Sequence, residues 1–175
     1  MHSTFVKSAK SAVPLHAVAA KDLKAWTARI PWLAASGFSA KDGEMCLVPG
    51  QNGRLKAAVL GLGKSRDALA LAAFAERLPA GLYRLGEVPD FCGHAQAALA
   101  WLLGQYRFSR YKKAPPRALK LVLPPGVDGE AVGSVAQNVF LARDLINTPP
   151  NALGPAELAA AAAALAKSHG AKFRT

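Results

Sequence analysis

Residues 44–65 read EMCLVPGQNGRLKAAVLGLGKS and contain two apolar runs separated by a turn signal. The runs at 44–48 and 55–60 have the length and apolar content of β-strands. Asn52-Gly53 lies between them and supplies the positive φ angles that a tight reversal requires. The two runs therefore predict an antiparallel hairpin.

On both sides of this hairpin, strand-like runs alternate with helical patterns. Further strands are predicted at residues 12–18, 81–85 and 119–123. Helices are predicted at residues 21–35 with a break at Pro31, at 66–78 with Ser65 as N-cap, and at 93–111. This alternation predicts an α/β fold class, with helices flanking a mixed sheet, for a domain of about residues 1–127.

Two further helices follow the last predicted strand. Asp128 or Gly129 begins the first, and its apolar residues predict a buried stripe: Val132, Val135, Val139, Ala142 and Ile146. The second begins at Gly154-Pro155 and ends at Gly170, and residues 171–175 read as the start of a strand. Residues 128–175 are therefore predicted to be a linker helix and the start of a truncated second domain. The apolar faces of both helices would then be partly exposed to solvent, which favours self-association.

The composition predicts a globular protein of the cytoplasm. Hydrophobic residues make up 51% of the 175 residues, which is enough apolar material for a buried core. Cys46 and Cys92 lie far apart without a CxxC pattern, which predicts two reduced, buried thiols. Pro14 and His16 interrupt the N-terminal apolar run, which argues against a signal peptide. No run reaches the ~20 apolar residues of a membrane span, so no membrane partner is expected.

Charge is the most unusual property, because 22 Lys+Arg against 11 Asp+Glu give a net charge of +11. One segment, residues 106–120, concentrates six cations around three aromatic residues: Arg107, Arg110, Lys112, Lys113, Arg117 and Lys120 around Tyr106, Phe108 and Tyr111. Such a segment would hold a nucleic-acid backbone while the aromatic rings stack on bases. The favoured interpretation is the C-terminal end of a helix, where cations are favourable and aromatic residues anchor the helix, and nucleic-acid binding is the alternative.

Residues 61–65, GLGKS, are similar to half of a phosphate-binding P-loop. The full pattern requires a glycine where Ala58 stands, so a simple strand-to-helix turn is favoured and nucleotide binding is the alternative. No HExxH motif or Ser/His/Asp set is present, and the four histidines are isolated: His2, His16, His94 and His169. The acidic residues near strand ends are read as loop solvation: Asp42, Glu44, Glu87 and Asp90. No residue is therefore assigned to a catalytic, metal-binding or substrate-binding site.

Two segments resemble a known family. Residues 141–155 read LARDLINTPPNALGP and resemble the LARDLxNTPxNxxxP junction of the cytosolic leucine aminopeptidase (leucyl aminopeptidase) family. Residues 104–112, GQYRFSRYK, resemble the GxYRFxRY element of the same family, and residues 37–44 and 60–63 agree with it. In that family the junction joins a non-catalytic, macro-domain-like N-terminal domain to a metallopeptidase domain. The resemblance implies the same fold and the same boundary here.

The resemblance also implies a function for a longer parent protein. That function is the release of N-terminal amino acids from peptides by water that two divalent ions, manganese or zinc, activate. The family's metal ligands and catalytic arginine belong to motifs of the GKGxxFDTGG and NTDAEGR types, which would follow Thr175. This chain is thus expected to hold no cofactor and to be inactive alone, and the intact protein is expected to be a homo-oligomer, a hexamer. The alternative is a stand-alone basic module that binds nucleic acid or a phosphate-bearing ligand.

Overall fold

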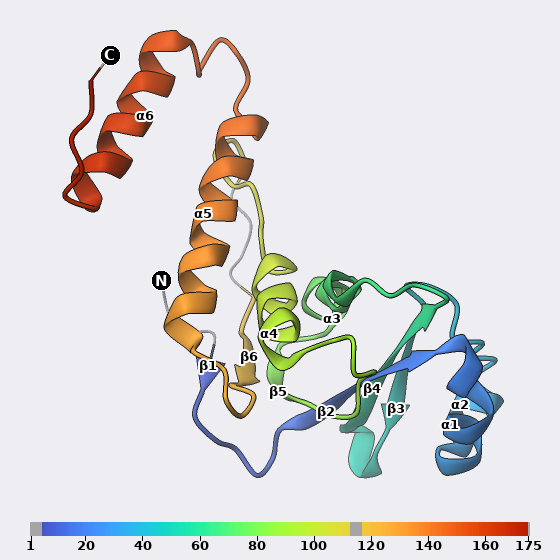
Figure 1. Ribbon diagram of the computed structural model, residues 1–175. Helices are drawn as coiled ribbons and strands as arrows, with labels where there is room; N and C mark the ends of the chain where they lie inside the picture. The colour runs from blue at the N-terminus through green and yellow to red at the C-terminus, as the bar shows by residue number, and fades with distance from the viewer. Residues whose placement is uncertain (1–4, 113–116, 175) are drawn as a thin grey trace.

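The computed structural model describes residues 5–112 and 117–174, and Figure 1 shows their arrangement. The strands are β1 (Phe5–Val6), β2 (Val13–Ala19), β3 (Met45–Pro49), β4 (Leu55–Gly63), β5 (Gly81–Leu85) and β6 (Leu119–Val122). The α-helices are α1 (Leu23–Arg29), α2 (Pro31–Ala35), α3 (Ala72–Arg77), α4 (His94–Leu103), α5 (Gly129–Asn147) and α6 (Pro155–Ser168). Three short 3-10 helices are η1 (Ala20–Asp22), η2 (Gln51–Gly53) and η3 (Ala68–Leu71).

The strands form one mixed sheet in the order β1-β6-β5-β2-β4-β3. β3 and β4 pair antiparallel, with Met45 opposite Leu60, and every other recorded pair is parallel. The reversal between β3 and β4 contains η2, in which Gly53 has φ of +70°, and the Gly50 N–H donates to Arg54 O at 2.7 Å. The predicted hairpin and the predicted mixed sheet are both confirmed.

Helices cover both faces of the sheet, and alternate residues of β4 belong to different cores. Ala57 and Val59 lie in a cluster with residues of α1 and α2. Ala58, Leu60 and Leu62 lie in a larger cluster with residues of α3 and α4. This is the alternation expected of a strand that is covered on both faces. Figure 1 shows α1 and α2 on one side of the sheet and α3 and α4 on the other.

Two predicted helices have different bounds in the structure. The helix predicted at 93–111 ends at Leu103, and Gly104 follows as its C-cap; Gly104 lies close to η3 and α3, since a Cβ there would be 2.2 Å from Ala72 O. The helix predicted at 66–78 begins later, with η3, and its N-cap is Asp67 rather than Ser65. The Asp67 carboxylate accepts the Leu69 N–H at 2.8 Å, whereas Ser65 Oγ only accepts the Asp67 N–H at 3.1 Å. The break at Pro31 is confirmed.

The C-terminal helices differ from the prediction in which face they bury. Asp128 caps α5 as predicted, accepting the Glu130 and Ala131 N–H groups at 2.9 and 3.0 Å. The residues of α5 in the core are Val132, Ala136 and Phe140, spaced by four. The predicted stripe is correct at Val132 but wrong at Val135, which is 49% exposed, and at Ile146, which is 82% exposed.

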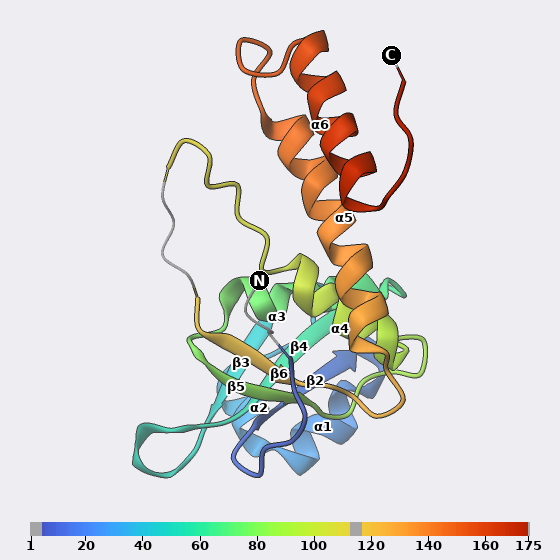
Figure 2. The same cartoon turned by 90° about the vertical axis from the view of Figure 1, so that its left-hand side faces the viewer.

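The last helix, α6, buries no residue. Residues 171–174 are not strand, so the predicted strand start is not seen there. α5 packs on α4 by its N-terminal half, and both C-terminal helices rise away from the sheet, as Figure 2 shows. The short strand β1, which the sequence pattern missed, pairs parallel with β6 and places Phe5 opposite Leu121.

Candidate functional site

One hollow of the described chain lies where β5, β2 and β4 end. These three strands are parallel neighbours, so their carboxyl ends meet at one edge of the sheet. After β2 the chain turns to α1 on one face, and after β4 it turns to α3 on the other (Figure 1). Loops that diverge in this way leave a crevice, which is where open α/β sheets bind ligands.

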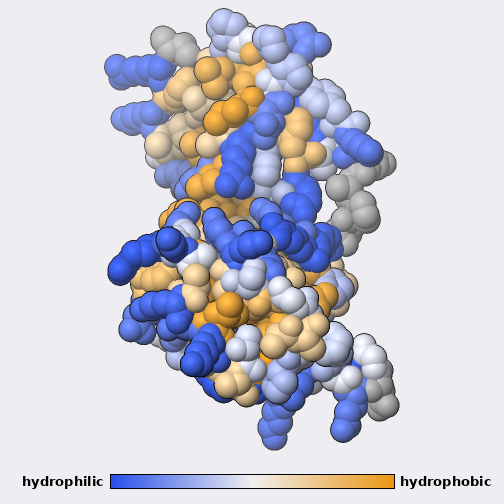
Figure 3. All heavy atoms as spheres, turned by 90° about the vertical axis from the view of Figure 1, so that its right-hand side faces the viewer, coloured by the Kyte–Doolittle hydropathy of each residue, from blue (hydrophilic) through white to orange (hydrophobic). Residues whose placement is uncertain are grey.

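This hollow, the carboxyl-edge pocket, has a volume of about 690 Å³ and takes its lining from three loops. The charged and aromatic residues of the lining are Lys21, Asp22, Lys64, Arg66, Asp90 and Phe91. The Arg66 guanidinium carbon lies 5.7 Å from the centre of the Phe91 ring. Figure 3 faces the side on which β2 and β4 end and shows hydrophilic side chains around an apolar centre on the sheet domain.

The GLGKS loop forms one wall of the pocket, and its glycines have a structural reason. A Cβ on Gly61 would lie 2.3 Å from Lys41 O, so the strand can pass residues 40–42 only with glycine there. Gly63 has φ of +56°, a left-handed conformation that glycine adopts freely, and its N–H donates to Ala40 O at 2.9 Å. These facts support the strand-to-turn interpretation of the glycines, while Lys64 and Ser65 still line the pocket.

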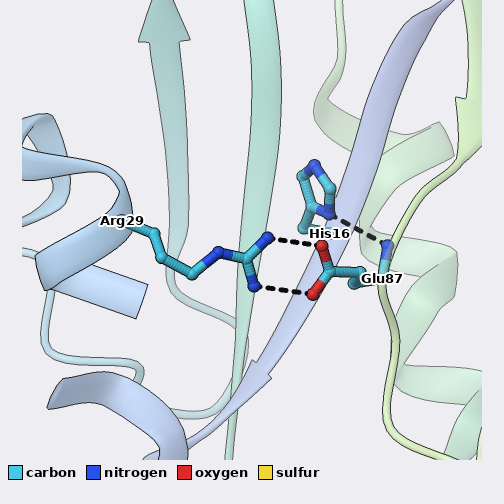
Figure 4. A network of polar contacts seen from close by, with 3 residues as sticks. All are labelled: His16, Arg29 and Glu87. Atoms are coloured by element: carbon cyan, nitrogen blue, oxygen red, sulfur yellow. Dashed lines mark hydrogen bonds and ion pairs between the residues drawn. The ribbon is translucent and has the colours of Figure 1, made fainter. Parts of the chain in front are cut away.

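His16 belongs to a clamp beside the pocket, shown in Figure 4. The Glu87 N–H donates to His16 Nδ1 at 2.9 Å, and Arg29 donates to both Glu87 carboxylate oxygens at 2.7 and 2.5 Å. Trp26 contacts both residues: its ring is tilted by 57° against the imidazole at a centroid distance of 5.0 Å, and its centre lies 4.7 Å from the Arg29 guanidinium carbon. Burial lowers the pKa of His16, so its neutral form is favoured as an acceptor. The clamp ties β2, α1 and the loop after β5 together.

The remaining predicted candidates lie apart from one another. His94 Nδ1 is 3.3 Å from Pro125 O, His169 is exposed after α6, and His2 lies outside the described residues. Cys46 and Cys92 are free and buried, as predicted, and burial raises the pKa of Cys92. Within residues 5–112 and 117–174, no three His, Cys, Asp or Glu side chains are grouped as metal ligands would be. No helix of that same part of the chain is long and apolar enough to cross a membrane.

The basic segment 106–120 is not a helix end, which corrects one of its two interpretations. Arg117 instead caps the C-terminal end of α3, donating to the carbonyl groups of Ala75 at 2.8 Å, Glu76 at 2.5 Å and, more closely, Leu78. Arg107 donates to Tyr106 O at 2.7 Å. The cations that stay exposed in the described part of this segment include Arg110, Lys112 and Lys120, and Lys113 lies outside it.

The two segments that carry the family resemblance contact each other. Tyr106 donates its hydroxyl hydrogen to Asp144 Oδ1 at 2.8 Å and accepts from Asn147 Nδ2 at 3.1 Å. Its ring packs 5.3 Å from Phe140, and the Arg143 guanidinium carbon lies 5.3 Å from the ring centre. We call these five residues the α5 latch. It joins the beginning of the GQYRFSRY segment to the helix that contains LARDLIN, and no sequence pattern predicted this contact.

The fold and these two segments define the class of protein. The family model for the N-terminal domain of M17 aminopeptidases matches residues 13–124. The chain therefore belongs to the M17 aminopeptidase family, and the resemblance to leucyl aminopeptidases is confirmed.

Curated relatives agree with this assignment. A probable cytosol aminopeptidase of Parasynechococcus marenigrum is 36% identical in an alignment 170 residues long, and the alignment covers 82% of this chain and 35% of that protein. A second, from Synechococcus sp. (strain CC9605), is 32% identical and covers 78% of this chain and 32% of that protein. This chain thus spans about a third of the length of these relatives.

Solved structures show the same fold. The cytosol aminopeptidase of Coxiella burnetii superimposes with a TM-score of 0.81 at 31% identity, covering 97% of this chain and 38% of that one. The bottromycin maturation enzyme BotP, solved in complex with Mn, gives a TM-score of 0.65 at 28% identity, covering 90% of this chain and 36% of that one. The α/β mixed sheet with flanking helices is therefore the fold of this family's N-terminal region.

Proposed function

We propose that this chain is the N-terminal, non-catalytic part of a metal-dependent leucyl aminopeptidase of the cytoplasm. The observation that carries the proposal is the match of residues 13–124 to the N-terminal domain of that family. The intact enzyme would release N-terminal amino acids from peptides, with two divalent ions, manganese or zinc, activating the attacking water. BotP, solved with Mn, supports the choice of metal.

Within this proposal the chain divides near residue 128. Residues 1–127 form the non-catalytic domain, and α5 with α6 lead into the peptidase domain. The family resemblance implies that residues of the peptidase domain would hold the two ions. The chain would then be inactive alone, and the intact enzyme would be a homo-oligomer, a hexamer.

The stand-alone binding module is not favoured as the function of the whole chain. The family model and both curated relatives assign the chain to aminopeptidases, and no nucleic-acid-binding relative is among them. Arg117 also serves the fold rather than a partner, because its guanidinium group caps α3.

The proposal is tested by assaying hydrolysis of a leucine anilide with added manganese, next to an intact mass measurement. The purified 18.3 kDa chain is expected to give no turnover, while a complete cytosol aminopeptidase under the same conditions gives a strong signal. Manganese-dependent turnover that elutes with the 18.3 kDa chain would refute the proposal.

A further inference from the structure

The carboxyl-edge pocket has the position of a ligand site, although the proposed function does not use it. It opens between the ends of β2 and β4, whose following loops leave toward opposite faces of the sheet. Its volume of about 690 Å³ lies within the ~300–1,000 Å³ range of small-molecule sites. The location alone does not identify a ligand, so the class of ligand is inferred from the chemistry of the residues that line the pocket.

Three cations from two loops line the pocket without an anionic partner. Lys21 follows β2, and Lys64 and Arg66 follow β4. Among the described residues, a salt bridge with an N–O distance within 4 Å is found between Arg29 and Glu87. None of the three pocket cations forms such a salt bridge within that part of the chain. Lysine and arginine side chains placed in this way bind oxyanions through charge-assisted hydrogen bonds.

Two carboxylates, Asp22 and Asp90, also line the pocket and limit the charge of a ligand. With three cations and two carboxylates, the lining carries a net charge of +1. That balance suits one phosphate group held at the cationic side and disfavours a polyphosphate or a nucleic-acid backbone. The carboxylates in turn accept hydrogen bonds from hydroxyl groups.

Phe91 gives the pocket an apolar wall next to a cation. Its ring is partly exposed, and Arg66 lies over it at 5.7 Å. Arginine held against an aromatic ring keeps its guanidinium group in place and leaves its outer donors free. A ligand with an apolar ring would contact Phe91 while its phosphate group meets Arg66 and Lys64.

From these observations we propose that the carboxyl-edge pocket binds a small phosphate ester with an apolar or aromatic moiety. Lys64, Arg66 and Lys21 bind the phosphate group, and Phe91 contacts the apolar moiety. The site belongs to the non-catalytic domain and does not depend on peptidase activity, so the two proposals fail independently.

The test is a titration of the full, ¹⁵N-labelled chain followed by amide chemical shifts. The probes are phenyl phosphate, inorganic phosphate and benzyl alcohol. Saturating shifts are expected at residues 63–66 and 89–91, with phenyl phosphate binding more tightly than inorganic phosphate and benzyl alcohol not saturating. Lys64→Ala is expected to weaken phenyl phosphate binding roughly five- to tenfold, and Lys64→Ala with Arg66→Ala to abolish saturation.

Lys56→Ala is the matched control, because Lys56 is an exposed lysine of β4 outside the pocket lining. It should leave the affinity unchanged, and the spectra of all variants report whether the fold is kept. The proposal is overturned by shifts that rise without saturation, by an unchanged affinity in the double variant, or by an equal loss in Lys56→Ala.

Discussion

At the scale of single residues, His16 shows how a partly buried base makes stability depend on pH. Its ring accepts the Glu87 N–H, and burial lowers its pKa below the ordinary value near 6.5, with Arg29 and Arg84 lowering it further against the attraction of Glu87. Because the folded pKa lies below the unfolded one, the unfolded chain binds more protons between them. Stability is therefore full above about pH 7 and falls as pH drops below 6.5 toward the folded pKa.

Urea unfolding of the wild type and His16→Gln at a series of pH values from 7.5 to about 5 checks this expectation. The wild type should lose stability over that interval, while His16→Gln should lose less because glutamine does not titrate. His94→Gln, which replaces an exposed histidine, should keep the wild-type slope. Equal slopes in all three proteins would show that His16 is not the titrating group.

Substitution of glycine by alanine is expected to have opposite effects on stability at Gly61 and Gly133. Gly61→Ala places a Cβ 2.3 Å from Lys41 O in the buried end of β4, so it should destabilise by roughly 1–3 kcal/mol. Gly133→Ala meets nothing within 4 Å on α5, so it should stabilise by up to about 1 kcal/mol. Thermal or urea unfolding measures both changes, and a neutral Gly61→Ala would contradict the close approach of β4 to residues 40–42.

At the scale of secondary structure, the α5 latch holds the C-terminal half of α5 to the sheet domain. Tyr106→Phe keeps the ring against Phe140 and Arg143 but removes the hydroxyl group that bonds Asp144 and Asn147. We expect a loss of at most about 1 kcal/mol, since the bonds are solvent-exposed, and faster hydrogen exchange at residues 143–147.

Hydrogen exchange measured by mass spectrometry distinguishes this local effect from general destabilisation. Exchange in the β2–β4 region should stay unchanged in Tyr106→Phe. Tyr111→Phe is the control, because Tyr111 is 59% exposed and outside the latch. If Tyr111→Phe accelerates hydrogen exchange at residues 143–147 as much as Tyr106→Phe does, the α5 latch does not restrain α5.

The elements differ in how far the sequence predicted them. Asn52-Gly53 predicted the hairpin correctly, because a turn with positive φ is a local property. The end of α4 at Leu103 was missed because the apolar and aromatic residues up to Tyr111 continue a helical pattern, and the reason for glycine at residue 104 is a contact with Ala72, which is distant in sequence. The buried face of α5 was predicted correctly only at Val132, because its apolar residues fit two overlapping stripes and packing on α4 selects the one that contains Ala136.

At the scale of the whole molecule, apolar side chains on α5, α6 and the C-terminal segment stay exposed. They are Val135, Ile146, Leu158, Leu165 and Phe173, between 39% and 82% accessible. Figure 3 shows apolar surface on this upper part of the molecule. Exposed apolar side chains promote association, so the chain should self-associate as its concentration rises.

Sedimentation and light scattering over a range of concentrations measure this association. Ile146→Glu, which charges the most exposed of these positions, should shift the equilibrium toward monomer. Leu47→Glu changes a residue that is 45% exposed on the edge strand β3 and should have no such effect. A strict monomer at every concentration would contradict the prediction.

Each candidate site is formed by residues from segments that are distant in sequence. The GLGKS loop gave a local signal, but the pocket also needs residues that follow β2 and β5, and their meeting is a result of parallel pairing. The α5 latch likewise joins Tyr106 to Asp144, 38 residues apart. Sequence patterns predict the individual elements and the family, whereas these sites are a product of the assembled topology.

The pairing of β1 with β6 has a consequence for the time course of folding. Phe5 lies opposite Leu121, so the first strand finds its neighbour only after nearly the whole sheet domain has been synthesised. Bringing such distant segments together carries a large loop-closure entropy, and sheets rich in such contacts form slowly. Among the described strands, β1 should therefore be the last to join the sheet during folding.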